Sequence, residues 1–201
     1  MKALFAPMIG LGLLLQGCAV TITGFNSGYK KLSPSEQEKI RFVAAGEAIP
    51  ATGSGLVYAV NAQSLLNALP AHDSSLVYIW GPNCHGKSCA SLQSLQDVCK
   101  RKGYRLYVVA EYYDMAQISL QAPLETPLLA VNQRFYKTDY CNKYTRLFSQ
   151  ELRNGQPLPD SVRYARYYLF KGKSFVKAAN AVKDTQPQFP QLQQLGLHKA
   201  G

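Results

Sequence analysis

Residue patterns that mark several common enzyme classes are missing from this 201-residue sequence. It has no G-x-G-x-x-G run and no phosphate-binding loop, so nothing in it indicates a nucleotide site. The G-x-S-x-G elbow of serine hydrolases is missing as well. A hydrolase would have to assemble its groups by folding alone, because His72, His85 and His198 lack a serine or acid at a recognisable spacing. We predict no cofactor.

Paired C-x2-C motifs, which make a zinc site recognisable in a sequence, are missing too. His85 and the cysteines near it leave zinc open as an alternative, but without the spacing that would favour it. We therefore assign no metal ligands.

A long hydrophobic run is also lacking, because the apolar residues 9–15 are too few for a membrane span. This run follows a single early charge and ends in Leu15, Gln16, Gly17 and Cys18. That ending resembles the lipobox of bacterial lipoproteins. The resemblance implies cleavage after residue 17 and acylation of Cys18, for example with palmitate. The membrane partner would then be bound through a lipid anchor, on the outer membrane or a periplasm-facing membrane of the cell envelope. An ordinary secretion signal and an uncleaved helix are the alternatives.

Acidic residues are few, with 12 Asp and Glu against 22 Lys and Arg. Removing Lys2 with the signal leaves a formal charge of +9, because 21 basic side chains then face 12 acidic ones. The basic residues are scattered and form no nucleic-acid motif, so we predict no nucleic-acid partner. Such charge suits anionic lipid, lipopolysaccharide-like surfaces or an acidic partner, although a merely solvated surface explains it equally.

Four cysteines remain after Cys18, an even number in a compartment that permits disulfides. Cys84 and Cys89 form the local pair. Cys99 falls on the buried face of a predicted helix. Cys141 could pair with Cys99 only if its own segment packs on that helix.

Residues 76–102 carry the candidate site. An apolar strand ending at Trp80 leads through a Gly-Pro-Asn turn to Cys84, and apolar residues at three- and four-residue steps then predict a helix that Gly103 ends. Cys84 would lie between the carboxyl end of a buried strand and the amino end of a helix, where backbone N–H groups favour a thiolate.

The run from Trp80 to Cys84 resembles the thioredoxin-like superfamily, in which a strand leads into Trp-x-x-x-Cys. The family's second cysteine follows after two residues, whereas four residues separate Cys84 from Cys89 here. Residues five apart in a helix point about 140° from each other and differ in height by roughly 7.5 Å, too far for a disulfide. The pair can close only if residues 85–87 form a loop and the helix begins near Ser88.

The resemblance implies catalysis by thiol–disulfide exchange. Cys84 would be the attacking thiol and Cys89 the resolving thiol, and His85 would lower the pKa of the attacking thiol. An inert disulfide that braces the loop, or two free thiols, fits the same residues.

Strand and helix patterns alternate along residues 56–120, which indicates an α/β domain. Strands are predicted at 56–60, 76–80 and 104–112, with a helix that Asn61 caps between the first two. The order resembles a thioredoxin-like three-layer sandwich, a mixed central sheet flanked by helices. We expect a signal peptide at 1–17, a lipidated tether with a short leader helix at 18–55, the domain at 56–183 and a flexible tail at 184–201.

Residues 164–178 predict a hairpin that is similar to the last two strands of the family. In the family a cis proline begins the first of these strands and binds the substrate backbone, and the matching position here is Ala165 or a neighbour. Thr126 and Pro127, which precede an apolar run, could supply this contact instead. The predicted substrate-binding residues are Trp80, Thr126, Pro127 and Tyr136.

Residues 132–155 are an expected insertion before the hairpin, with a helix from about Asn142. Its aromatic residues could form a platform over the cysteines, where Tyr136, Tyr140 and Cys141 contact a partner, or they could fill the core. A strand ends at Tyr112, Tyr113 and Asp114, so these residues could approach the site or simply lie at the rim of the sheet.

Two functions therefore stay open. The first is a membrane-anchored thioredoxin-like lipoprotein that exchanges disulfides with envelope proteins and draws electrons from a membrane donor. The second is a non-catalytic envelope binding or structural module in which the cysteines brace a loop.

Overall fold

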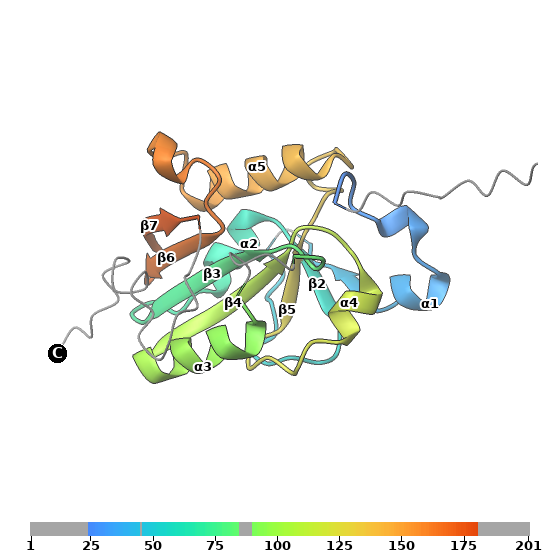
Figure 1. The fold of residues 1–201 in the computed structure, drawn as a ribbon, viewed down its shortest axis with the longest axis horizontal. Helices are drawn as coiled ribbons and strands as arrows, with labels where there is room; N and C mark the ends of the chain where they lie inside the picture. The colour runs from blue at the N-terminus through green and yellow to red at the C-terminus, as the bar shows by residue number, and fades with distance from the viewer. Residues whose placement is uncertain (1–23, 45, 85–89, 181–201) are drawn as a thin grey trace, which may run out of the picture.

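The computed structural model describes residues 24–44, 46–84 and 90–180, which form a mixed sheet with helices on both faces (Figure 1). The strands of the described part are β1 (Ile40–Phe42), β2 (Val57–Val60), β3 (Ser74–Trp80), β4 (Tyr104–Ala110), β5 (Leu128–Val131), β6 (Tyr167–Lys171) and β7 (Ser174–Ala179). Their order across the sheet is β1-β2-β5-β4-β3-β6-β7. The first five strands in this order run parallel to one another, whereas β6 is antiparallel to β3 and β7 is antiparallel to β6.

The helices divide between the two faces of the sheet. They are α1 (Pro34–Gln37), α2 (Ala62–Ala68), α3 (Leu92–Lys102), α4 (Met115–Ser119) and α5 (Cys141–Leu152), with 3-10 turns η1 (Tyr29–Lys31) and η2 (Asp160–Val162). Helix α3 packs on one face, and α2 and α5 pack on the other (Figure 1). This arrangement confirms the predicted α/β class with a mixed central sheet between helical layers.

The alternation of side chains along β3 separates two apolar cores. Leu76, Tyr78 and Trp80 point toward α3, while Val77 and Ile79 point toward α2 and α5. Strands covered on both faces read as continuous apolar runs, as β3 and β4 do. The pairing of β3 with β4 continues to Trp80 and Ala110, so both strands end at the same edge.

Local signals in the sequence are confirmed where they involve side-chain caps. The Asn61 side chain accepts a hydrogen bond of 2.7 Å from the Ser64 amide at the start of α2. Ser33 and Glu36 form a capping box at the start of α1, in which the Glu36 carboxylate accepts a hydrogen bond of 2.9 Å from the Ser33 amide. Asp114 caps α4 through the Gln117 amide at 3.0 Å.

The predicted hairpin is confirmed as β6 and β7, and its turn requires glycine. Gly172 has a φ of 56°, and a Cβ there would lie 2.4 Å from the carbonyl oxygen of Ala71. A side chain at this position would therefore be both strained and obstructed.

The domain extends further toward the amino terminus than predicted. Helix α1 ends at Gln37, and the chain then enters β1, which pairs with β2 from Ile40 onward. Upstream of α1, the Tyr113 amide donates to Ser27 at 2.7 Å, and the Cys141 amide donates to Phe25 at 3.0 Å. The described residues upstream of the predicted boundary at residue 56 therefore pair with the same folded unit.

Two other expectations change. Helix α3 begins at Leu92 with Ser91 as its cap, so it starts downstream of the expected Ser88. The apolar run at 128–131 is the central strand β5, inserted between β2 and β4.

The predicted signal peptide, Cys18, His85, Cys89 and the predicted tail lie outside the described residues. Within the described ranges, no helix combines the length and hydrophobicity that crossing a bilayer requires.

The aromatic face of the insertion packs into the core, and a truncation tests its contribution. Phe148 on α5 is fully buried. We expect Phe148→Ala to lower the free energy of unfolding by about 3–5 kcal/mol, since it leaves a cavity. Urea denaturation followed by circular dichroism measures this loss. The exposed neighbour Gln150 is the matched control, and Gln150→Ala should change stability by less than about 0.5 kcal/mol. Equal effects of both substitutions would contradict a core role for α5.

Candidate functional site

The loop that follows β3 lies at the edge where the parallel strands β3 and β4 end. In open α/β sheets this carboxyl edge is where ligands and reacting groups gather. Gly81 and Pro82 are buried, and Asn83 and Cys84 are half-buried. A hydrogen bond of 2.9 Å from the Cys84 amide to the Gly81 carbonyl closes the turn. Cys84, which the sequence predicts to carry the reactive sulfur, therefore lies at this edge of the sheet. We call the edge, with its loop from Gly81 to Cys84, the Cys84 rim.

Residues just after β4 fix this loop. The hydroxyl of Tyr112 accepts a hydrogen bond from the Asn83 amide at 3.0 Å. The carboxylate of Asp114 accepts one from the Asn83 side chain at 2.7 Å. Tyr112 and Asp114 therefore reach the rim as predicted, and they position the residue immediately before Cys84.

The three cysteines that the structure describes occupy different environments. Cys84 is disulfide-bonded. Cys99 and Cys141 are free and buried. Cys99 lies in the core beneath α3 and Cys141 in the core beneath α5, on opposite faces of the sheet. A disulfide between Cys99 and Cys141, left open by the sequence, is therefore excluded.

The two free thiols are unsuited to nucleophilic chemistry. Burial raises the pKa of the Cys99 thiol to about 12, so this sulfur stays protonated at neutral pH. Burial also raises the pKa of Cys141. Among the described cysteines, only Cys84 stands at the solvent-facing rim.

An ion pair that the sequence did not point to borders the loop. Arg166, just before β6, donates to the Glu111 carboxylate at 3.0 Å and to the Ile79 carbonyl at 3.2 Å. A Cβ on Gly81 would lie 3.3 Å from the Glu111 carboxylate, 3.7 Å from Arg166 and 3.8 Å from the Cβ of Cys84. The space beside Gly81 is therefore bordered by Cys84, Glu111 and Arg166.

Burial opposes the charge on Arg166, but Glu111 outweighs it, and the pKa of the guanidinium is raised. The two side chains are partly screened from water, with 34% of Arg166 and 16% of Glu111 exposed. A charged pair in this position can bias the ionisation of a neighbouring sulfur.

The sequence contained weak signals for both residues. Glu111 directly follows the β4 strand, at the edge that the strand order assigns to the site. Arg166 adjoins Ala165, the position that the resemblance assigns to the family's cis proline.

The predicted substrate-binding residues do not gather around Cys84. Trp80 is 4% exposed within the core beneath α3. Tyr136 donates its hydroxyl to Glu151 at 2.7 Å and accepts from the Ala62 amide, so it links α5 to α2. Tyr136 is half-buried and Cys141 is buried, which fits the alternative in which these residues fill the core, whereas Tyr140 is 43% exposed.

Thr126 and Pro127 lie at the opposite end of the strands from Cys84. Pro127 immediately precedes β5, and the Thr126 hydroxyl donates to the Leu106 carbonyl near the start of β4 at 2.6 Å. The described residues contain no cis peptide bond, so Pro127 is trans. Neither residue takes the place of the family's proline beside the sulfur.

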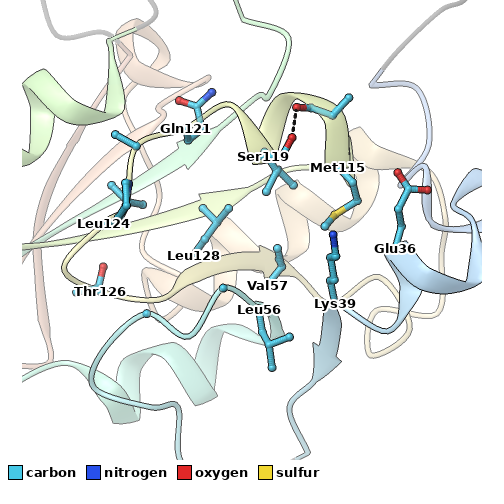
Figure 2. A pocket seen from close by; sticks show the side chains of 16 residues that line it. Glu36, Lys39, Leu56, Val57, Met115, Ser119, Gln121, Leu124, Thr126 and Leu128 are labelled. Atoms are coloured by element: carbon cyan, nitrogen blue, oxygen red, sulfur yellow. Dashed lines mark hydrogen bonds between the residues drawn. The ribbon is translucent and has the colours of Figure 1, made fainter.

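A hollow of about 600 Å³ lies at that opposite end of the strands (Figure 2). Figure 2 shows Leu124, Leu128 and Met115 around it, with Lys39 and Glu36 along one side. Glu36 is half-buried and engaged in the α1 capping box. No cysteine or histidine lines this hollow, so the chemistry of the described chain concentrates at the Cys84 rim.

Comparisons of the chain with protein-family models, with curated proteins and with solved structures find no match.

The Glu111–Arg166 ion pair should contribute more to the free energy of unfolding than an exposed pair of the same charges, because it is partly desolvated. A double-mutant cycle with Glu111→Gln and Arg166→Gln, measured by urea denaturation, should give a coupling of about 1–2 kcal/mol. Lys100 and Glu125 supply the control, since they are 3.1 Å apart but 71% and 61% exposed. Their cycle should give less than about 0.5 kcal/mol. Similar coupling energies in both cycles would mean that partial burial does not strengthen the Glu111–Arg166 ion pair.

Proposed function

We propose that this protein is a lipid-anchored, thioredoxin-like envelope protein that carries out thiol–disulfide exchange on other envelope proteins. The observation that supports this most is the setting of Cys84, a disulfide-bonded sulfur at the carboxyl edge of β3 with the Glu111–Arg166 pair beside it. With Cys99 and Cys141 free, and Cys18 assigned to the lipid, the proposed partner of Cys84 is Cys89.

The start of α3 supports this pairing. The geometric objection to a Cys84–Cys89 disulfide was that both residues could belong to one helix. Cys84, Ala90 and Ser91 are not helical and α3 begins only at Leu92, so Cys84 is not part of α3. The objection therefore does not apply to this helix.

In the proposed cycle, the Cys84 thiolate attacks a substrate disulfide, forms a mixed disulfide and releases one substrate thiolate. The Cys89 thiolate then attacks the Cys84 sulfur, releases the second substrate thiolate and closes the Cys84–Cys89 disulfide. The substrate gains two electrons, and a membrane dithiol donor returns two electrons to the cysteine pair.

The strand order supports the thioredoxin-like part of the proposal. A strand that leads to the cysteine, a helix, a parallel strand and an antiparallel closing hairpin occur in the expected order. Strand β5 and helix α5 are additions within this plan.

A non-catalytic module is the second candidate, and two observations favour it. Trp80 is buried, so it offers no surface to a substrate. The position before β6 carries Arg166 instead of the proline that binds substrate backbone in the family. In this case the Cys84 disulfide would only brace the rim.

Trapping separates the two functions. If Cys84 attacks and Cys89 resolves, Cys89→Ser should accumulate a mixed disulfide with a disulfide-containing peptide, while Cys84→Ser should form none. Alkylation and mass mapping identify the trapped sulfur. Cys99→Ala is the control and should leave trapping in the Cys89→Ser background unchanged.

The reduction potential gives an independent measure. Exchange is expected to bring a potential between about −120 and −270 mV in glutathione or dithiothreitol buffers. A potential below about −300 mV, together with no trapped intermediate, would assign the disulfide to a structural role.

The rim charges should act on the reduced Cys84 in opposite directions. Arg166→Gln removes a cation that favours the thiolate, so alkylation of reduced Cys84 by iodoacetamide at neutral pH should slow by roughly three- to tenfold. Glu111→Gln leaves Arg166 unopposed and should accelerate the same reaction. Cys99 in the same samples is the internal control and should stay unmodified, because its thiol is buried and protonated. Equal shifts in both variants would mean that neither charge senses the sulfur.

A further inference from the structure

A groove of about 610 Å³ lies next to the Cys84 rim, on the face of the sheet that α5 covers. Helix α5 forms one side, and residues 158–166, which lead into β6, form the other. This volume is within the range of sites that bind ligands in proteins, roughly 300–1,000 Å³.

The groove is lined by an excess of positive charge. Its cations are Lys143, Arg146, Arg153, Arg163 and Arg166, whereas Glu111 is its one carboxylate. Glu111 is neutralised by Arg166. The ion pairs of the described residues include none of the other four cations, so their charge is uncompensated.

Two of these cations are held in place without any acid. Arg153 donates to the carbonyl oxygens of Ser149 and Gln156, which orient its guanidinium along the groove wall. Arg163 lies over the ring of Tyr164, 5.7 Å from its centroid. Arginines positioned in this way lose less side-chain entropy when they bind a carboxylate.

Aromatic side chains flank the charged groups. Tyr164 is 79% exposed and Tyr140 is 43% exposed, and both line the groove. Exposed tyrosines and arginines are typical of surfaces that bind protein segments.

The groove adjoins the cysteine site through shared residues. Glu111, Arg166 and Ile79 line the groove, and Glu111 and Arg166 also lie within 4 Å of the point beside Gly81 that Cys84 borders. A segment bound in the groove would therefore have one end beside Cys84.

We propose that this groove binds an acidic, extended segment of an envelope protein and presents a disulfide in that segment to Cys84. This inference rests on the proposed function and names its substrate class. A protein segment fits better than a membrane surface, because the cations line a hollow between two elements, whereas a bilayer needs charges on an outward-facing surface.

Direct binding tests the groove without any exchange chemistry. The protein carries Cys84→Ser, and the probe is a fluorescein-labelled glutamate-rich peptide without cysteine, compared with a glutamine-rich peptide of equal length. We expect anisotropy titration at low salt to show about tenfold tighter binding of the glutamate peptide, with the difference shrinking at high salt.

Charge reversal locates the binding surface. Arg146→Glu with Arg163→Glu should abolish the preference for the glutamate peptide. Lys171→Glu with Lys173→Glu makes the same change in net charge at the exposed hairpin turn, and this control should retain the preference. Thermal unfolding by circular dichroism verifies that all variants are folded.

The outcomes separate this inference from the proposed function. Equal binding of the two peptides, or equal losses in both charge-reversal variants, would overturn the groove proposal. Binding of phosphatidylglycerol vesicles through Arg146 and Arg163, with no binding of the glutamate peptide, would also overturn it in favour of a membrane contact. If the glutamate peptide binds but Cys89→Ser traps no mixed disulfide with a cystine version of it, the groove stands as a docking site and exchange fails.

Discussion

The guanidinium of Arg166 joins three strands at one edge of the sheet. Its two side-chain hydrogen bonds connect it to the end of β3 and to the residue after β4, while its own backbone pairs with Ile79 and Ala179. The loop that carries Cys84 leaves β3 at this junction. The charge beside the Cys84 loop and part of the groove wall therefore depend on one side chain, whose charge is balanced by Glu111. The balance also explains why a charged group can occupy a place that is largely closed to water.

The local parts of the fold could be predicted from sequence because they depend on neighbouring residues. Asn61 and Asp114 cap helices by accepting from amides three residues further along, and the Glu36 carboxylate accepts from the Ser33 amide. The turn at Gly172 needs a conformation that glycine adopts readily. The burial of Cys99 followed from helical periodicity alone. Each of these features is encoded within a few residues.

Long-range features escaped prediction because they depend on pairings that no local pattern specifies. The placement of β5 between β2 and β4 is set by strand register, and a four-residue apolar run does not encode its neighbours. The pairing of Glu111 with Arg166 spans 55 residues, so it becomes visible only once β4 and β6 flank β3. For Trp80, a local pattern predicted a contact that the long-range packing rules out. Its spacing to Cys84 suggested a contact with substrate, yet its place in the β3 alternation directs it toward α3 and the core.

The amino-terminal leader has a consequence for how far the rim can stand from a membrane. A Cβ on Gly24 would lie 3.2 Å from the ring of Tyr112, whose hydroxyl holds Asn83, so the chain meets the folded unit at the cysteine edge. Six residues separate Cys18 from Gly24 in sequence number, and even a fully extended chain of that length reaches only about 20 Å. If Cys18 carries the proposed lipid, Cys84 would work close above the bilayer surface. Its reach would then cover the juxtamembrane parts of neighbouring proteins and leave out domains that project far from the lipid.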